Sequence, residues 1–160
     1  MRAGDGGWPT GARPAVQVEG SVVIRAEPSE VWSVLSDVSR WSRWHRGISF
    51  AQLRGPLERG TYFHWRVDGM NVLAVVSQVE EERELTWGGS CFGARLHHSW
   101  QLRSRGSGET ELRAVHSVDG LFVRLLKGTV RRTVNRSMEE WFRGLKAGAE
   151  EGDMSERGEP

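Results

Sequence analysis

Polar and apolar residues alternate along most of the chain in the manner of strands. Residues 16–25 place Val18, Val22 and Ile24 on one side and polar residues on the other, which is typical of a half-buried strand. Between Ile48 and Asp119, turn-forming residues separate further segments and predict six strands, at 48–54, 61–68, 71–80, 83–90, 94–104 and 109–119. The connections are too short for parallel crossovers, so we expect an antiparallel sheet.

Helical spacing interrupts this pattern twice. Pro28, Ser29 and Glu30 suit the first turn of a short helix, and a second short helix follows Asp37. After Gly120 the apolar positions recur with a helical period as one stripe, formed by Leu121, Leu125, Leu126, Val130, Val134, Met138, Trp141 and Leu145. We therefore predict one long C-terminal helix that covers one face of the sheet.

These elements predict a single α+β domain. Its seven-stranded, curved antiparallel sheet would surround the long helix, with two short helices after the first strand. A length of 160 residues suits one domain, which we place at residues 16–149. Residues 1–15 are rich in Gly, Pro and Ala, and residues 150–160 are acidic and nearly free of apolar side chains. We expect both segments, an N-terminal arm and an acidic tail, to be disordered.

Composition and charge narrow the possible partners. The 22 Lys and Arg residues nearly balance the 21 Asp and Glu residues, for a net charge of +1, so we expect no nucleic-acid partner. Cys91 is the only cysteine, which excludes an intramolecular disulfide and suits a reducing compartment. No apolar run is long enough for a membrane span, and Met1 to Pro14 lack that of a secretory signal. We expect a cytoplasmic protein. The sequence does not indicate its oligomeric state.

Two histidines are the candidates for chemistry. Alternation puts His98 and His116 on the apolar, inward face of neighbouring strands, and a hairpin centred near residues 106 and 107 places His98 opposite residue 115 or 116. Imidazole can relay protons near neutral pH, so the pair could assist an aldol-type cyclisation or a dehydration. Alternatively, both histidines could be hydrogen-bonded residues of a cavity wall with no catalytic role.

A wider set of inward positions would contact a ligand. Eight tryptophans are many for this length, and their flat rings suit an aromatic ligand, although they could equally fill a core. The candidate ligand-binding residues are Phe63, Trp65, Trp87, Leu96, Trp100, Leu112, Ala114, Val130, Val134 and Met138. No spacing of ligands suits a metal, and no glycine-rich phosphate motif is present. We expect no metal and no cofactor.

Several short motifs in order resemble those of a known superfamily. They are Ala26-Glu27-Pro28-Ser29-Glu30-Val31-Trp32, Asp37 with Trp41 and Trp44, Gly60-Thr61, Leu85-Thr86-Trp87 and Leu145-Lys146. Over about residues 16 to 149 the chain resembles the START-related polyketide cyclase/dehydrase superfamily (SRPBCC). The resemblance implies a START-like helix-grip fold around a deep apolar cavity. Members bind lipids, sterols, plant hormones or polyketides, some cyclise or dehydrate such ligands, and one branch activates a chaperone ATPase.

Three functions therefore stay open, and whether the protein is an enzyme is one of the open points. The leading hypothesis is a cyclase or dehydratase of secondary metabolism that encloses a hydrophobic aromatic or polyketide-like molecule, with His98 and His116 as catalytic residues. The second is a non-catalytic carrier or sensor of a hydrophobic metabolite. The third is a protein-binding module of the chaperone-activator kind, whose cavity would be filled by tryptophan and which would expose an apolar patch instead.

Overall fold

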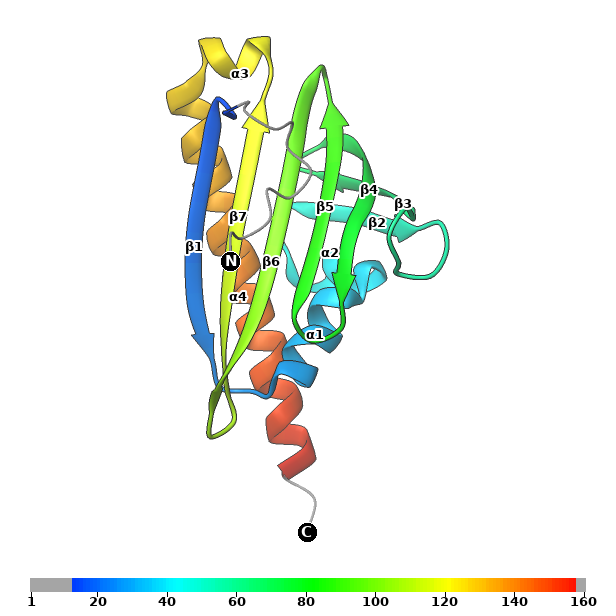
Figure 1. Ribbon diagram of the computed structural model, residues 1–160, viewed down its shortest axis with the longest axis vertical. Coiled ribbons are helices and arrows are strands. Elements are labelled where there is room, and N and C mark those ends of the chain that lie inside the picture. The colour runs from blue at the N-terminus through cyan, green and yellow to red at the C-terminus, as the bar shows by residue number, and fades with distance from the viewer. Residues whose placement is uncertain (1–12, 158–160) are drawn as a thin grey trace.

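The computed structural model describes residues 13–157, and the side chains of residues 13–152. Seven strands form one sheet in the order β1-β7-β6-β5-β4-β3-β2 (Figure 1). Their bounds are β1 Val16–Ile24, β2 Ile48–Leu53, β3 Tyr62–Val67, β4 Met70–Glu80, β5 Glu84–Cys91, β6 Ala94–Gly106 and β7 Glu109–Asp119. Every neighbouring pair is antiparallel, as the short connections predicted.

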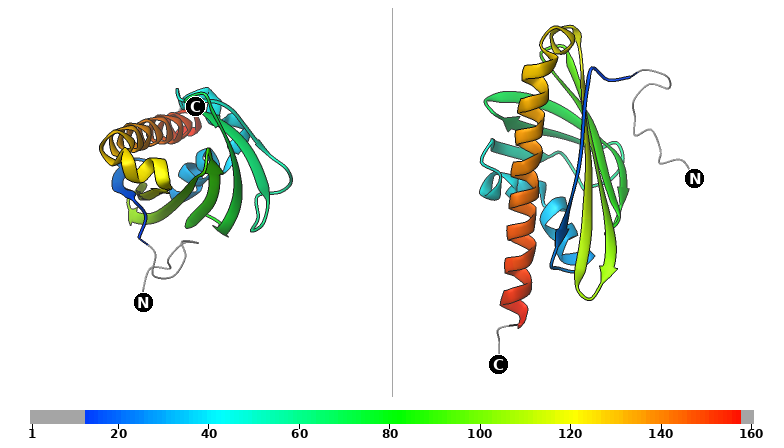
Figure 2. Two further views of the ribbon diagram at one scale, coloured as in Figure 1. Left: turned by 90° about the horizontal axis from the view of Figure 1, so that it is seen from above. Right: turned by 90° about the vertical axis from the view of Figure 1, so that its left-hand side faces the viewer.

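The helices lie against the concave side of this sheet. Two short helices, α1 (Pro28–Ser36) and α2 (Trp41–Trp44), are joined by the 3-10 turn η1 (Val38–Arg40), and α3 (Leu121–Leu125) precedes the long α4 (Lys127–Arg157). Seen from above in Figure 2, the sheet curves around α4. The predicted α+β helix-grip fold is confirmed. No helix within residues 13–157 has both the length and the apolar character needed to cross a bilayer.

The predicted C-terminal helix is in fact two helices. Leu126 leaves the helical conformation, with φ −116° and ψ 31°, and separates α3 from α4. Because of this break, Leu121, Leu125 and Leu126 are exposed and do not continue the apolar stripe of α4 onto the sheet. The stripe beyond the break behaves as predicted, since Met138, Trp141 and Leu145 are buried.

The predicted disordered tail is wrong for residues 150–157, which continue α4. The carboxylate of Glu150 accepts a hydrogen bond from the Arg25 backbone N–H at 2.9 Å and lies 3.0 Å from Lys146 Nζ. These contacts tie the helix to the end of β1. The predicted N-terminal arm lies mostly outside the described residues, as do residues 158–160.

An aromatic cluster fills the part of the space between the sheet and α4 that lies away from α3. Trp141 of α4 is fully buried at its centre, with ring centroids 4.8 Å from Trp41 and 5.0 Å from Trp100. Gly144, one turn further on, lies so close to Trp44 that a Cβ atom there would overlap the indole ring. The glycine therefore lets α4 approach α2 and close this end of the core.

Candidate functional site

At the α3 end, the space between the sheet and α4 contains a cavity of about 590 Å³, enclosed by the sheet, α3 and the first turns of α4. Its walls are mainly apolar, with Trp65, Val72, Leu96 and Val118 from the strands facing Val123, Val130 and Val134 from the helices. The polar side chains that line it are Asp68, His98, His116, Thr129, Thr133 and Ser137. The volume lies in the range of about 300–1,000 Å³ that is usual for small-molecule sites.

His98 and His116 form one pair at the cavity wall. They are directly opposite each other in the β6–β7 ladder, as the hairpin predicted, and their ring centroids are 4.2 Å apart. The aromatic cluster holds both rings. His98 stacks on Trp87 at 5.1 Å with an interplanar angle of 12°, and His116 meets the edge of Trp100 at 5.1 Å. Packing on the core thus fixes the orientation of both imidazoles toward the cavity.

Burial keeps both imidazoles neutral. Burial, with smaller contributions from the nearby His45 and His97, lowers the pKa of His116 to about 3. The pKa of His98 is also held well below its usual value, first by burial and then by the charge that His116 would carry. A neutral imidazole has one N–H donor and one acceptor nitrogen. The pair therefore offers the cavity hydrogen bonding without charge.

Three buried polar atoms around the cavity lack partners. His98 Nδ1, His116 Nε2 and Trp65 Nε1 make no hydrogen bond to any described residue. A buried polar atom without a partner costs about 1–3 kcal/mol, so such atoms are uncommon in native proteins. Five further atoms of this kind belong to residues outside the cavity lining, namely His45, Trp87, His97, Trp100 and Trp141, so unpartnered atoms are a feature of the whole aromatic core and not of the cavity alone.

The structure brings together only part of the predicted site. Trp65, Leu96, Val130 and Val134 line the cavity together with the two histidines. The other six predicted residues do not line it and belong to the buried core beside it, namely Phe63, Trp87, Trp100, Leu112, Ala114 and Met138. Their inward orientation was correctly predicted. Their distance from the cavity along the strand or helix was not predicted, because alternation shows which face of the sheet a residue lies on but not how far along the strand the cavity extends.

Sequence reasoning missed several lining residues. Thr129, Thr133 and Ser137 recur every four positions along α4, and this polar stripe beside Val130 and Val134 was a signal that could have found them. Asp68 lines the cavity from the β3–β4 turn. Cys91 also lines the cavity, and burial raises the pKa of its thiol, which disfavours the reactive thiolate.

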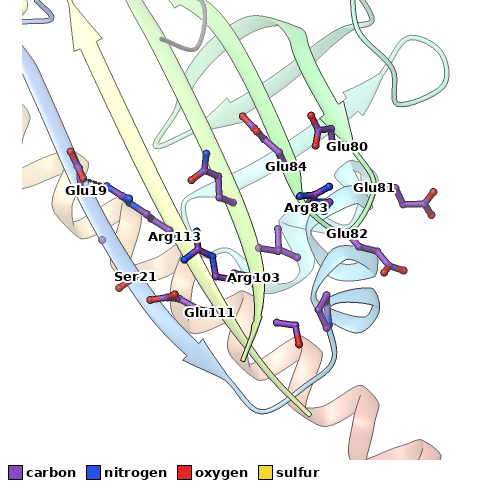
Figure 3. Close-up of a pocket in the computed structure, with 15 residues that line it drawn as sticks. Glu19, Ser21, Glu80, Glu81, Glu82, Arg83, Glu84, Arg103, Glu111 and Arg113 are labelled. Carbon is purple, nitrogen blue, oxygen red and sulfur yellow. Dashed lines mark hydrogen bonds and ion pairs between the residues drawn. The ribbon is translucent and has the colours of Figure 1, made fainter. Parts of the chain in front are cut away.

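Other hollows in the described residues are less suited to a ligand. One of about 1,010 Å³ lies on the outer face of the sheet and is lined by charged side chains such as Glu80, Glu84 and Arg103 (Figure 3). Arg113, also in its lining, is paired with Glu19 at 2.8 Å. Most of these side chains are exposed, so water already solvates them. Within the described residues, no three His, Cys, Asp or Glu side chains form a possible metal cluster.

Comparison with known proteins agrees with this geometry. The family described as "Polyketide cyclase / dehydrase and lipid transport" matches residues 15–150. No curated protein matches the sequence.

Solved structures share the fold at low sequence identity. A hypothetical protein from Helicobacter pylori superposes with a TM-score of 0.78 at 20% identity, covering 89% of this chain and 94% of that one. The ZhuI aromatase/cyclase from Streptomyces sp. R1128 gives 0.73 at 14% identity, with 84% and 93% covered. A START superfamily protein from Mycobacterium smegmatis gives 0.59 at 16% identity, with 77% and 94% covered. Identities this low establish the fold alone.

Proposed function

The chain belongs to the polyketide cyclase, dehydrase and lipid transport family, and from that premise we propose that it encloses a hydrophobic aromatic or polyketide-like molecule and promotes its cyclisation or dehydration. The observation that carries this proposal is the apolar cavity of about 590 Å³ with the His98–His116 pair at its wall. The aromatase/cyclase neighbour supports the reaction class by analogy of fold.

Apolar walls would supply the first part of catalysis. Residues such as Val72, Val118 and Val130 exclude water and leave a flexible ligand few conformations. Holding two reacting carbons of one chain together in this way can provide several kcal/mol without any strongly acidic or basic group. The imidazoles of His98 and His116, which line the cavity, would add hydrogen bonds to the oxygen atoms of the ligand.

The histidine pair would supply the proton movements while staying neutral. With a pKa near 3, His116 is too weak a base to be protonated as a separate step at neutral pH. A neutral imidazole can instead accept a proton at one nitrogen while it donates the proton of the other. In a dehydration, one proton leaves a ligand carbon and one joins the departing hydroxyl, so that water forms and the pair ends uncharged in the other tautomer.

A double substitution tests this role. We expect His98→Phe with His116→Phe to lower turnover about tenfold or more on a substrate shown to bind, because the relay is lost while the shape of the cavity is largely kept. The substrate is to be found by native mass spectrometry of freshly purified protein, followed by identification of any bound molecule and incubation with its precursor. The matched control is His64→Phe, an exposed histidine on β3 outside the cavity. Unchanged turnover in the double variant would exclude the catalytic role.

The second candidate function is that of a non-catalytic carrier or sensor of a hydrophobic metabolite. The low pKa of both histidines and the apolar walls favour it. A carrier or sensor would release its ligand unaltered and would tolerate His98→Asn and His116→Asn. The third hypothesis, a protein-binding module, is less well supported, because Trp87 and Trp100 fill the core beside the cavity and leave the cavity itself open.

A further inference from the structure

Large apolar side chains are exposed at the end of the molecule where the cavity lies. Phe92 of the β5–β6 turn is 86% exposed, and Leu121, Phe122, Leu125 and Leu126 of and beside α3 are 50–76% exposed. Figure 1 shows α3 and this turn at the same end of the sheet. Phe92 and Phe122 also line the cavity, so these five residues, here called the rim patch, border its mouth. Several large apolar side chains exposed together at one end of a protein indicate an interaction site.

The backbone conformation at Phe92 indicates that this residue is not there to stabilise the fold. Phe92 and Gly93 have φ values of 48° and 75°, and positive φ is unfavourable for a bulky residue. The β3–β4 turn has a similar pair of positive φ values, 49° and 78°, at Asp68 and Gly69, which are residue types that tolerate this conformation well. A phenylalanine in the strained position, with its ring in water, contributes neither turn preference nor core packing.

Cations flank the rim patch. From Gly120 to Ser137 the chain carries Arg124, Lys127, Arg131, Arg132 and Arg136, and no Asp or Glu. The acidic groups nearby are Asp68 at the mouth and Asp119, which is paired with Arg124 at 3.0 Å and with Arg95 at 3.7 Å. This end of the protein is therefore both apolar and positively charged.

We propose that the rim patch docks on the surface of an anionic lipid bilayer, with its apolar side chains inserted among the lipids and the cations at the headgroups. A basic segment with exposed aromatic and aliphatic residues has the composition of an interfacial anchor, and each cation near an anionic surface adds about fivefold in affinity. A second copy of this chain fits the patch less well, because a twofold interface would bring the cations of both copies together. The orientation turns the mouth of the cavity toward the membrane.

Vesicle flotation tests this docking. We expect the protein to float with vesicles that contain about one-third phosphatidylglycerol in phosphatidylcholine. Binding to phosphatidylcholine alone should be at least tenfold weaker, and about 1 M salt should weaken binding to the anionic vesicles, because surface charges are then screened.

Two pairs of variants locate the contact. Phe92→Asn combined with Phe122→Ser should raise the dissociation constant for the anionic vesicles at least tenfold, and the asparagine suits the positive φ of the turn, so folding is not at risk. Tyr62→Thr is the control, at an aromatic residue of β3 that is also exposed. Lys127→Glu with Arg132→Glu should also weaken binding at least tenfold, whereas Arg103→Glu with Arg105→Glu, in the β6–β7 hairpin at the other end, should have little effect.

Three results would overturn the proposal. They are absence of binding to anionic vesicles, equal losses in the rim and control variants, and a concentration-dependent dimer that Phe92→Asn dissociates, which would assign the patch to a second copy. The assay needs no cavity ligand, so its outcome is independent of the proposed enzymatic function. Conversely, an empty cavity would leave the vesicle result unchanged.

Discussion

Trp141→Ala is expected to lower the free energy of unfolding by about 3–5 kcal/mol, the usual cost of replacing a buried tryptophan. Trp141 is fully buried, and its ring contacts those of Trp41 and Trp44 from α2 and that of Trp100 from the sheet. Alanine would remove these contacts and leave a cavity where α4 is anchored. The loss would be a large part of the 5–15 kcal/mol that typically stabilises a domain. Urea unfolding followed by circular dichroism measures it.

Two companion variants keep this prediction decisive if the alanine variant does not fold. Trp141→Phe retains an aromatic ring and removes an indole N–H that has no partner among the described residues, so it should cost less than Trp141→Ala. Phe92→Ala removes an exposed ring and should change stability by no more than about 0.5 kcal/mol. Equal effects of Trp141→Ala and Phe92→Ala would contradict the described core.

Acid should destabilise the fold through the histidine pair before most carboxylates titrate. His116 has a pKa near 3 in the folded state and about 6.5 when unfolded, so between these values the unfolded chain binds the additional proton. Stability therefore rises with pH across this window and falls as the pH is lowered. The slope is about 1.4 kcal/mol per pH unit for each such histidine, which makes about 2 kcal/mol for His116 between pH 6.5 and 5.

His98 contributes with the same sign, because its folded pKa is also well below the usual value. His45 and His97 are lowered by burial as well and add in the same direction. Asp119 and Glu150 have lowered pKa values, so their contribution is lost at lower pH, as it falls through the carboxylate range. Urea unfolding at pH 6.5 and 5 measures the slope. His98→Leu with His116→Leu should flatten it, and an unchanged slope would show that the pair is not buried and neutral.

Local patterns were sufficient to predict most of the fold. Strand alternation and short turns predicted the antiparallel order, because neighbouring strands joined by a few residues have no other way to pair. The same reasoning placed His98 opposite residue 115 or 116, since the hairpin turn sets the register of both strands, and the structure pairs it with His116. The functional role of the pair does not follow from this register and stays a proposal.

Three features depended on contacts that the sequence pattern does not contain. The helix break at Leu126 lies within an unbroken apolar stripe, so periodicity could not reveal it. Residues 150–157 contain one apolar side chain, Met154, but extending a helix that is already anchored avoids the cost of nucleation. Glu150 also adds contacts to Arg25 and Lys146. The boundary between core and cavity depends on how Trp87 and Trp100 pack against Trp141, which is a property of the assembled fold.

Binding of a neutral aromatic probe to the cavity is the most direct test of the central claim, that the space beside His98 and His116 admits a small apolar molecule. The probe is N-phenyl-1-naphthylamine, followed by its fluorescence and by quenching of tryptophan, since Trp65 lines the cavity. Val134→Trp would fill the cavity from α4, and Asn135→Trp places the same side chain on an exposed neighbouring position. We predict saturable binding by the wild type and by Asn135→Trp, and at least tenfold weaker binding by Val134→Trp. Equal binding by all three proteins, or none by the wild type, would contradict the claim.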